Sequence, residues 1–264
     1  MNYKLLFPTY RNRYCFVREQ LKKYAGAGKY LHCLNLGTGE GDYDPMIAAA
    51  CERLSACDIN GNDIAFARRM NQGIGNLEYS VENALALTFA DKAFDLLVCV
   101  DVMEHVGKPE QMTREIARVL KPGGLAFITF PQSNFPWTYD PVNYLLERRA
   151  IAQGAYAFGH EYLVNPDEFH QWCSKHGLEV VEDKNLSGYL VALLEMYWTG
   201  LIQRMFKENA GNVNGRKENK VKLRPTVREP WPVRLTDAVA RLDRLLFGSA
   251  RHSVGKGFVV RRLS

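Results

Sequence analysis

A glycine-rich turn after an apolar run is the first feature of this sequence that could do chemistry. The run 30–36 stops at three glycines in a G-x-G-x-G spacing, Gly37, Gly39 and Gly41. Glycine tolerates backbone conformations that are closed to other residues and lets a ligand approach main-chain N–H groups closely. A tight turn that binds no ligand can have the same pattern, so a lone glycine motif is weak evidence for a binding site.

The residues around this turn favour a nucleoside over a dinucleotide. A dinucleotide fingerprint has its third glycine where this chain has Asp42, and a carboxylate there would repel a pyrophosphate. Asp58 ends the next apolar segment, where a carboxylate can accept hydrogen bonds from ribose hydroxyls. We therefore expect a nucleoside ligand that lacks a pyrophosphate.

Strand-like and helix-like segments alternate around these residues. The predicted strands are 30–36, 55–60, 77–84, the apolar start of 94–106, 125–130, 177–186 and 256–264. The predicted helices are 11–24, 44–54, 65–73 and 109–120, and a Lys-Pro-Gly-Gly sequence at 121–124 stops the last one. This order predicts a doubly wound α/β fold, a mainly parallel sheet with helices on both faces. Ligands of such folds bind beyond the carboxyl ends of the strands, where the glycine turn lies.

Composition indicates one globular α/β domain with an appendage, because the chain has 264 residues and 47% hydrophobic content. Its six cysteines include no C-x-x-C pair, which favours a reducing compartment and predicts no metal site. The first residues carry charges and a proline instead of an apolar leader. These features predict a cytoplasmic protein.

Four motifs in the expected order make the chain similar to the class I S-adenosylmethionine-dependent methyltransferases, in particular to the methyltransferase type 11-like domain. They are the glycine segment 34–41, Asp58, the pair Asn83 and Ala84, and the segments 94–106 and 117–129. The resemblance implies a Rossmann-like sheet of seven strands. It also implies S-adenosyl-L-methionine as cofactor and S-adenosyl-L-homocysteine as product.

The same resemblance implies which residues hold the cofactor. The glycines would form the cofactor turn, and Asp58 would bind the ribose. Asn83 and Ala84 would face the adenine, and Asp101 would complete the wall of the cofactor site. The full expected set is Asn35, Leu36, Gly37, Thr38, Gly39, Gly41, Asp58, Ile59, Asn83, Ala84 and Asp101.

Two positions depart from the family pattern, and each has an amide where the family usually has an acid. An amide oxygen at Asn83 can still accept from the adenine amine. Asn35 loses a negative charge near the cofactor's ammonium, and we expect Glu40 or Asp42 to compensate. The competing interpretation is a non-catalytic module that binds the cofactor or its product without turnover.

Methyl transfer from a sulfonium is an in-line displacement, so a general base is needed only if the acceptor must lose a proton. His105 follows the fourth predicted strand and is the first candidate, because imidazole titrates near neutral pH. A hydrogen bond to the adjacent loop is the alternative role. His160 and Tyr139 lie where the family usually contacts its acceptor. Trp137, Asp140 and Glu161 accompany them in the sequence.

An insertion of residues 187–255 separates the last two predicted strands. The sequence therefore predicts two units, a methyltransferase domain of 1–186 with 256–264 and a helical, basic insertion. Segment 189–206 is apolar nearly all round, and helix 234–248 places leucines on one face and arginines elsewhere. Segment 189–206 could be buried on the domain, form a homodimer contact, or lie as a lid in a bilayer interface.

Charge is distributed unevenly along the chain. Residues 204–264 carry 15 Lys and Arg against 5 Asp and Glu, whereas residues 1–203 carry 19 against 24. The first interpretation is peripheral membrane contact through 188–250, with a small-molecule or lipid-linked acceptor. The second is a cap over the active site with a solvated basic rim. RNA binding ranks last, because no aromatic and basic stacking surface is apparent.

Overall fold

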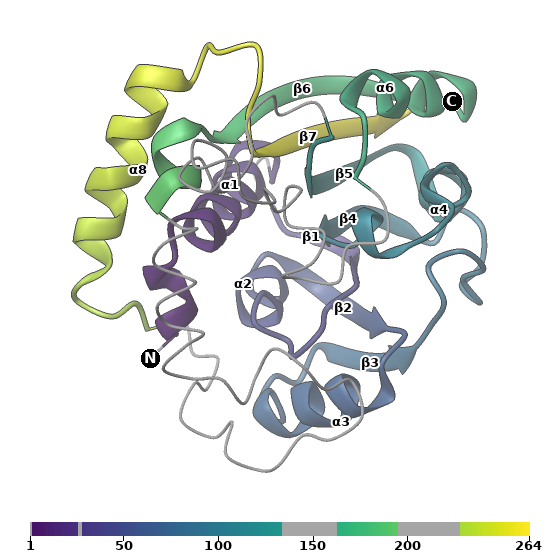
Figure 1. Ribbon diagram of the computed structural model, residues 1–264. Helices are drawn as coiled ribbons and strands as arrows, with labels where there is room; N and C mark the ends of the chain where they lie inside the picture. The colour runs from purple at the N-terminus through teal and green to yellow at the C-terminus, as the bar shows by residue number, and fades with distance from the viewer. Residues whose placement is uncertain (1, 26–27, 134–162, 195–227) are drawn as a thin grey trace.

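A seven-stranded sheet organises the chain (Figure 1). The computed structural model describes residues 2–25, 28–133, 163–194 and 228–264. The strand order is β3-β2-β1-β4-β5-β7-β6. Their bounds are β1 Tyr30–Leu36, β2 Cys51–Asp58, β3 Leu77–Val81, β4 Phe94–Val100, β5 Leu120–Pro131, β6 Leu178–Ser187 and β7 Gly255–Arg262. β7 runs antiparallel to β5 and β6, and the remaining pairs are parallel.

Helices cover both faces of this sheet, as the doubly wound fold predicts. The described helices are η1 Tyr3–Leu6, α1 Pro8–Tyr24, α2 Asp44–Ala49, α3 Gly61–Met70, η2 Met103–His105, α4 Pro109–Val119, α6 Pro166–Lys175 and α8 Val233–Phe247. Alternate residues of β4 face opposite layers: Leu97 packs with the core on the α4 and α6 side, and Leu96 packs with the core on the α1 and α2 side. The predicted α/β architecture is confirmed.

Several predicted boundaries differ from the structure, because strand pairing or a local turn competes with the sequence pattern. The predicted helix 44–54 ends at Ala49, since Cys51 begins β2 and pairs with Tyr30 of β1. The helix predicted to stop at Lys-Pro-Gly-Gly, residues 121–124, ends one residue early at Val119, since Leu120 pairs with Phe94. The third strand, expected over 77–84, ends at Val81. The secondary-structure propensity of a segment does not account for the hydrogen bonds that a neighbouring strand supplies.

The insertion lies between β6 and β7, as predicted, and its α8 helix packs beside α1 and η1 (Figure 1). Most of the apolar segment 189–206 and of the basic segment 211–232 lies outside the described residues. Within the described part of the chain, no helix has the length and apolarity needed to cross a bilayer. The division into two units stays a prediction.

Candidate functional site

The three glycines of the turn serve different purposes. All have positive φ, at 76° for Gly37, 54° for Gly39 and 83° for Gly41. A Cβ at Gly37 would overlap Val102, and a Cβ at Gly41 would lie 2.7 Å from Asn71 Nδ2. At Gly39, no described atom lies within 4 Å of the Cβ position. Two glycines are therefore required by packing, and Gly39 presents open backbone.

Asp58 lies directly beside this open backbone, at the carboxyl end of β2. Its Oδ2 accepts a hydrogen bond from Gly39 N at 2.9 Å, and its Oδ1 accepts one from Asn60 N at 2.9 Å. Two exposed apolar side chains lie next to Asp58. Ile59 follows it in the sequence and is 70% exposed, and Val81, which pairs with Asp58 across β2 and β3, is 58% exposed. A carboxylate next to exposed aliphatic surface suits a sugar joined to a planar base.

A buried network explains the amide at Asn35. Asn35 Nδ2 donates to Asp44 Oδ1 at 2.6 Å and to Thr38 Oγ1 at 3.1 Å. Tyr79 Oη donates to Asp44 Oδ2 at 2.6 Å. Burial raises the pKa of the Asp44 carboxyl. Hydrogen bonds from Tyr79, Asn35 and Thr38 lower this pKa, but the effect of burial is larger. An acid at position 35 would place two carboxylates in contact in this buried site, whereas the amide supplies a donor.

Glu40 and Asp42, the residues expected to replace the missing charge, are both engaged by another side chain, and the expectation stays a prediction. Both carboxylates form ion pairs with Lys4 of η1, Glu40 at 3.2 Å. Burial lowers the pKa of the Lys4 ammonium, but Asp42 and Glu40 outweigh it and the pKa is raised. The carboxylate that contacts Asn35 is Asp44 instead.

Asp101 is held at the carboxyl end of β4 by partners on two other elements. Thr129 Oγ1 of β5 donates to its Oδ1 at 2.9 Å, and Arg13 Nε of α1 lies 2.5 Å from its Oδ2. Asp101 has a φ of 53°, uncommon for a residue with a side chain. Arg13 is buried. Sequence reasoning missed Arg13, because its place opposite Asp101 depends on how α1 packs and no motif marks it.

Buried polar groups surround the Arg13–Asp101 pair. Tyr43 Oη and Glu104 Oε2 have no hydrogen-bond partner among the described residues. Burial, reinforced by the charge of Asp101, raises the pKa of Glu104 and of Tyr43 well above their usual ranges. The ring of Tyr43 lies 5.6 Å from that of Tyr14. These groups add an aromatic and largely uncharged wall that sequence reasoning also missed.

The remaining predicted cofactor residues differ in exposure. Leu36 and Thr38 are buried, and Thr38 Oγ1 donates to Asp44, so their side chains point into the fold. Asn83 is exposed, and its Oδ1 accepts from Leu85 N at 2.9 Å. Ala84 is half-buried next to it.

Of the predicted catalytic residues, the structure describes one. His105 is exposed at the end of η2. The other two, His160 and Tyr139, lie outside the described residues, as do the accompanying Trp137, Asp140 and Glu161. The described residues contain no cluster of three or more His, Cys, Asp or Glu side chains arranged to hold a metal ion.

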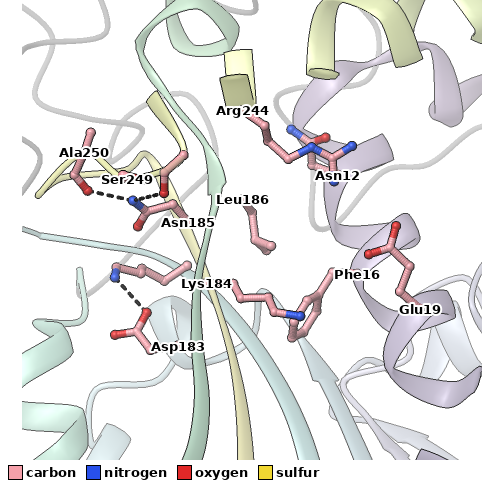
Figure 2. Close-up of a pocket in the computed structure, with 12 residues that line it drawn as sticks. Asn12, Phe16, Glu19, Asp183, Lys184, Asn185, Leu186, Arg244, Ser249 and Ala250 are labelled. Atoms are coloured by element: carbon pink, nitrogen blue, oxygen red, sulfur yellow. Dashed lines mark hydrogen bonds and ion pairs between the residues drawn. The ribbon is translucent and has the colours of Figure 1, made fainter. Parts of the chain in front are cut away.

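A separate cavity of ≈ 510 Å³ lies away from the glycine turn, between α1, β6 and the residues after α8 (Figure 2). Phe16 and Leu186 form its apolar part, and Asn185 Nδ2 donates to Ala250 O at 2.7 Å at its edge. None of the predicted site residues lines it. It belongs to the seam between the insertion and the sheet.

Comparison with known proteins agrees with this geometry. A family model described as a methyltransferase domain matches residues 34–128. A ubiquinone biosynthesis O-methyltransferase of Coxiella burnetii is 26% identical over 153 residues, which are 57% of this chain and 64% of the relative. A ubiquinone/menaquinone biosynthesis C-methyltransferase UbiE of Hydrogenovibrio crunogenus is 30% identical over 178 residues, 61% of this chain and 70% of the relative. The chain belongs to the class I S-adenosylmethionine-dependent methyltransferases.

A solved structure shows the same methyltransferase fold. The N-methyltransferase NodS of Bradyrhizobium japonicum, in complex with S-adenosyl-L-homocysteine, superposes with a TM-score of 0.53 at 17% identity, over 70% of this chain and 83% of that chain. The similarity to the Coxiella relative spans 64% of that protein. Family membership therefore concerns the methyltransferase domain, and the acceptor has to be argued from the site.

Proposed function

We propose that this methyltransferase transfers the methyl group of S-adenosyl-L-methionine to a hydroxyl or amine of a small-molecule or lipid-like acceptor. One observation carries the cofactor part of the proposal: Gly39 offers open backbone with positive φ directly beside the Asp58 carboxylate. A nucleoside can approach this turn without displacing a side chain, and a ribose can hydrogen-bond to the carboxylate.

The described residues fit each part of the cofactor. Asp58 suits the ribose hydroxyls, and the exposed Ile59 and Val81 suit the faces of the adenine. The amino acid end carries one ammonium and one carboxylate, which match the Asp101 carboxylate and the Arg13 guanidinium. Asn83 and Ala84 stand at the predicted adenine edge as further proposed contacts.

The cofactor supplies a methyl group already activated by a positively charged sulfur. The protein therefore has to orient the acceptor, exclude water and, for a hydroxyl acceptor, accept one proton. We assign that proton to His105, which is exposed at the carboxyl edge of the sheet. For this role its imidazole must be neutral before transfer.

The acceptor proposal rests on the relatives. The Coxiella relative is named as an O-methyltransferase of ubiquinone biosynthesis. The Hydrogenovibrio relative is named as a C-methyltransferase of ubiquinone and menaquinone biosynthesis. Both names concern a hydrophobic ring compound. We therefore propose a hydrophobic hydroxyl compound as the first acceptor class, with O-methylation as the reaction.

The test has a binding step and a transfer step. Calorimetric titration with S-adenosyl-L-methionine and with S-adenosyl-L-homocysteine should show binding near micromolar Kd, about −8 kcal/mol. A radiolabelled methyl group should then appear on phenolic compounds with apolar side chains. Absence of binding for both ligands would overturn the proposal. Binding without transfer to any hydroxyl or amine compound would favour the non-catalytic module.

A further inference from the structure

Helix α8 turns its leucines outward. Leu235 is 72% exposed and Leu245 is 82% exposed. Leu242 and Leu246 are exposed on the same side, and Trp231 before the helix is also exposed. Since successive helical residues are offset by about 100°, these four leucines span an arc of about 100° along α8. This apolar strip is defined as the leucine face.

Most basic residues of α8 lie on a different side of the helix from its acidic residues. Arg234 and Arg241 are exposed along one edge of the leucine face, whereas Arg244 lines the cavity beside α1. Both acids of the helix point inward: Asp237 pairs with Arg11 of α1 at 2.8 Å, and Asp243 is buried. The outer side of α8 therefore combines leucine with arginine, and neither acid of this helix lies there.

The inner side of α8 is fixed to the rest of the domain. Asp243 accepts hydrogen bonds from Gly188 N at 2.6 Å, Leu190 N at 3.0 Å and Val191 N at 3.1 Å, which caps the helical residues 189–194. Arg11 binds Asp237 and also Glu229, at 2.6 Å. α8 thus presents its leucine face on a well-anchored helix.

We propose that the leucine face of α8 docks onto an anionic phospholipid surface. The leucines would enter the boundary between headgroups and acyl chains, and Arg234 and Arg241 would contact lipid phosphates. This arrangement of an apolar strip with a basic edge and no outward acid is the pattern of an interfacial helix. A nucleic acid would leave the leucines in water, so it matches the surface less well.

Docking would also place the methyltransferase site relative to the bilayer. α1 carries Arg11, which binds α8, two residues before Arg13, which binds Asp101. α1 therefore connects the docking helix to the proposed cofactor site. The docking itself is independent of methyl transfer and is tested separately.

The experiment is co-sedimentation of the full chain with phosphatidylcholine vesicles, with and without roughly one third phosphatidylglycerol. The full chain should bind the anionic vesicles and bind neutral vesicles weakly. Leu242→Ser with Leu245→Ser should reduce binding about 30-fold, because two leucines no longer enter the interface. Arg234→Gln with Arg241→Gln should reduce binding to anionic vesicles about 30-fold and remove the preference for them.

Matched variants separate docking from general effects. Leu263→Ser removes an exposed leucine outside α8, and Arg69→Gln removes an exposed arginine on α3. Both should bind vesicles like the parent chain, and every variant should keep the parent's melting temperature. The proposal is overturned if the chain stays in the supernatant, if the leucine pair variant binds normally, or if light scattering shows that this variant instead dissociates a dimer.

Discussion

Arg13 Nε of α1 lies 2.5 Å from Asp101 Oδ2 at the end of β4, so the first long helix places a buried cation at the carboxyl edge of the sheet. An ion pair in this position costs desolvation that its mutual attraction only partly offsets. In the proposed cofactor complex, the ammonium and carboxylate of the ligand would approach these two groups. This relationship gives the proposed cofactor site its sharpest test.

Arg13→Gln should weaken S-adenosyl-L-homocysteine binding about 10- to 100-fold, the usual range for loss of a charged hydrogen-bond partner. It should leave binding of methylthioadenosine unchanged, because that nucleoside lacks the amino acid end. Calorimetry with both ligands measures the difference. Arg18→Gln on the same helix serves as the control. Equal losses for the two ligands would show that Arg13 supports the fold instead of the amino acid end.

Asp58→Asn should lower the affinity for both of these nucleosides about tenfold. The amide keeps one acceptor oxygen for backbone N–H groups but removes the charge that strengthens hydrogen bonds from ribose hydroxyls. The matched control is Asp91→Asn, at a carboxylate that is exposed and pairs with Arg118. Unchanged affinity in Asp58→Asn would remove the ribose assignment.

The glycine turn predicts two different defects. Gly41→Ala should destabilise the fold by about 2 to 4 kcal/mol, since positive φ and a contact 2.7 Å from Asn71 Nδ2 both oppose a Cβ. Gly39→Ala should cost only about 1 kcal/mol of stability, from its φ alone. It should nevertheless weaken S-adenosyl-L-homocysteine binding more than Gly41→Ala does. Urea unfolding and calorimetry of both variants check this. The reverse order of stabilities would contradict it.

Glu104 should make stability fall with rising pH. Burial, reinforced by Asp101, raises its pKa, so the folded chain keeps this proton at pH values where the unfolded chain has released it. The folded state then binds more protons, and the free energy of unfolding falls by at most about 1.4 kcal/mol per pH unit above the unfolded pKa.

Glu104→Gln should remove that slope. Its free energy of unfolding, measured in urea from about pH 5 to about pH 8, should rise relative to the parent chain as pH increases. Glu78→Gln, at an exposed glutamate, should give a curve parallel to the parent. A parallel curve for Glu104→Gln would mean that Glu104 ionises normally in the folded protein.

Arg11→Met should destabilise the protein by about 3 kcal/mol, because Glu229 and Asp237 lose the buried cation that joins the insertion to α1. Arg18→Met removes a more exposed partner of Glu229 and should cost less than about 1 kcal/mol. Chemical unfolding gives both values. Similar losses in the two variants would show that burial of Arg11 does not control this contact.

The order of strands and helices follows largely from the sequence, because buried parallel strands and helix faces leave strong local patterns. β1 begins and ends where predicted, at Tyr30 and Leu36. The helix expected over 44–54 failed at its second half, since Cys51 gains backbone partners in β1 that the segment's own residues do not reveal. Sequence-based reasoning is weakest where a distant strand supplies the hydrogen bonds.

The glycine turn, the predicted role of Asp58 and the family could be inferred from residue type and spacing along short stretches. The contact of Asp44 with Asn35, the contact of Arg13 with Asp101 and the outward direction of the α8 leucines could not. Each of these depends on how separate elements pack. Packing brings together residues far apart in the chain, and a local pattern carries no record of which partner a side chain meets.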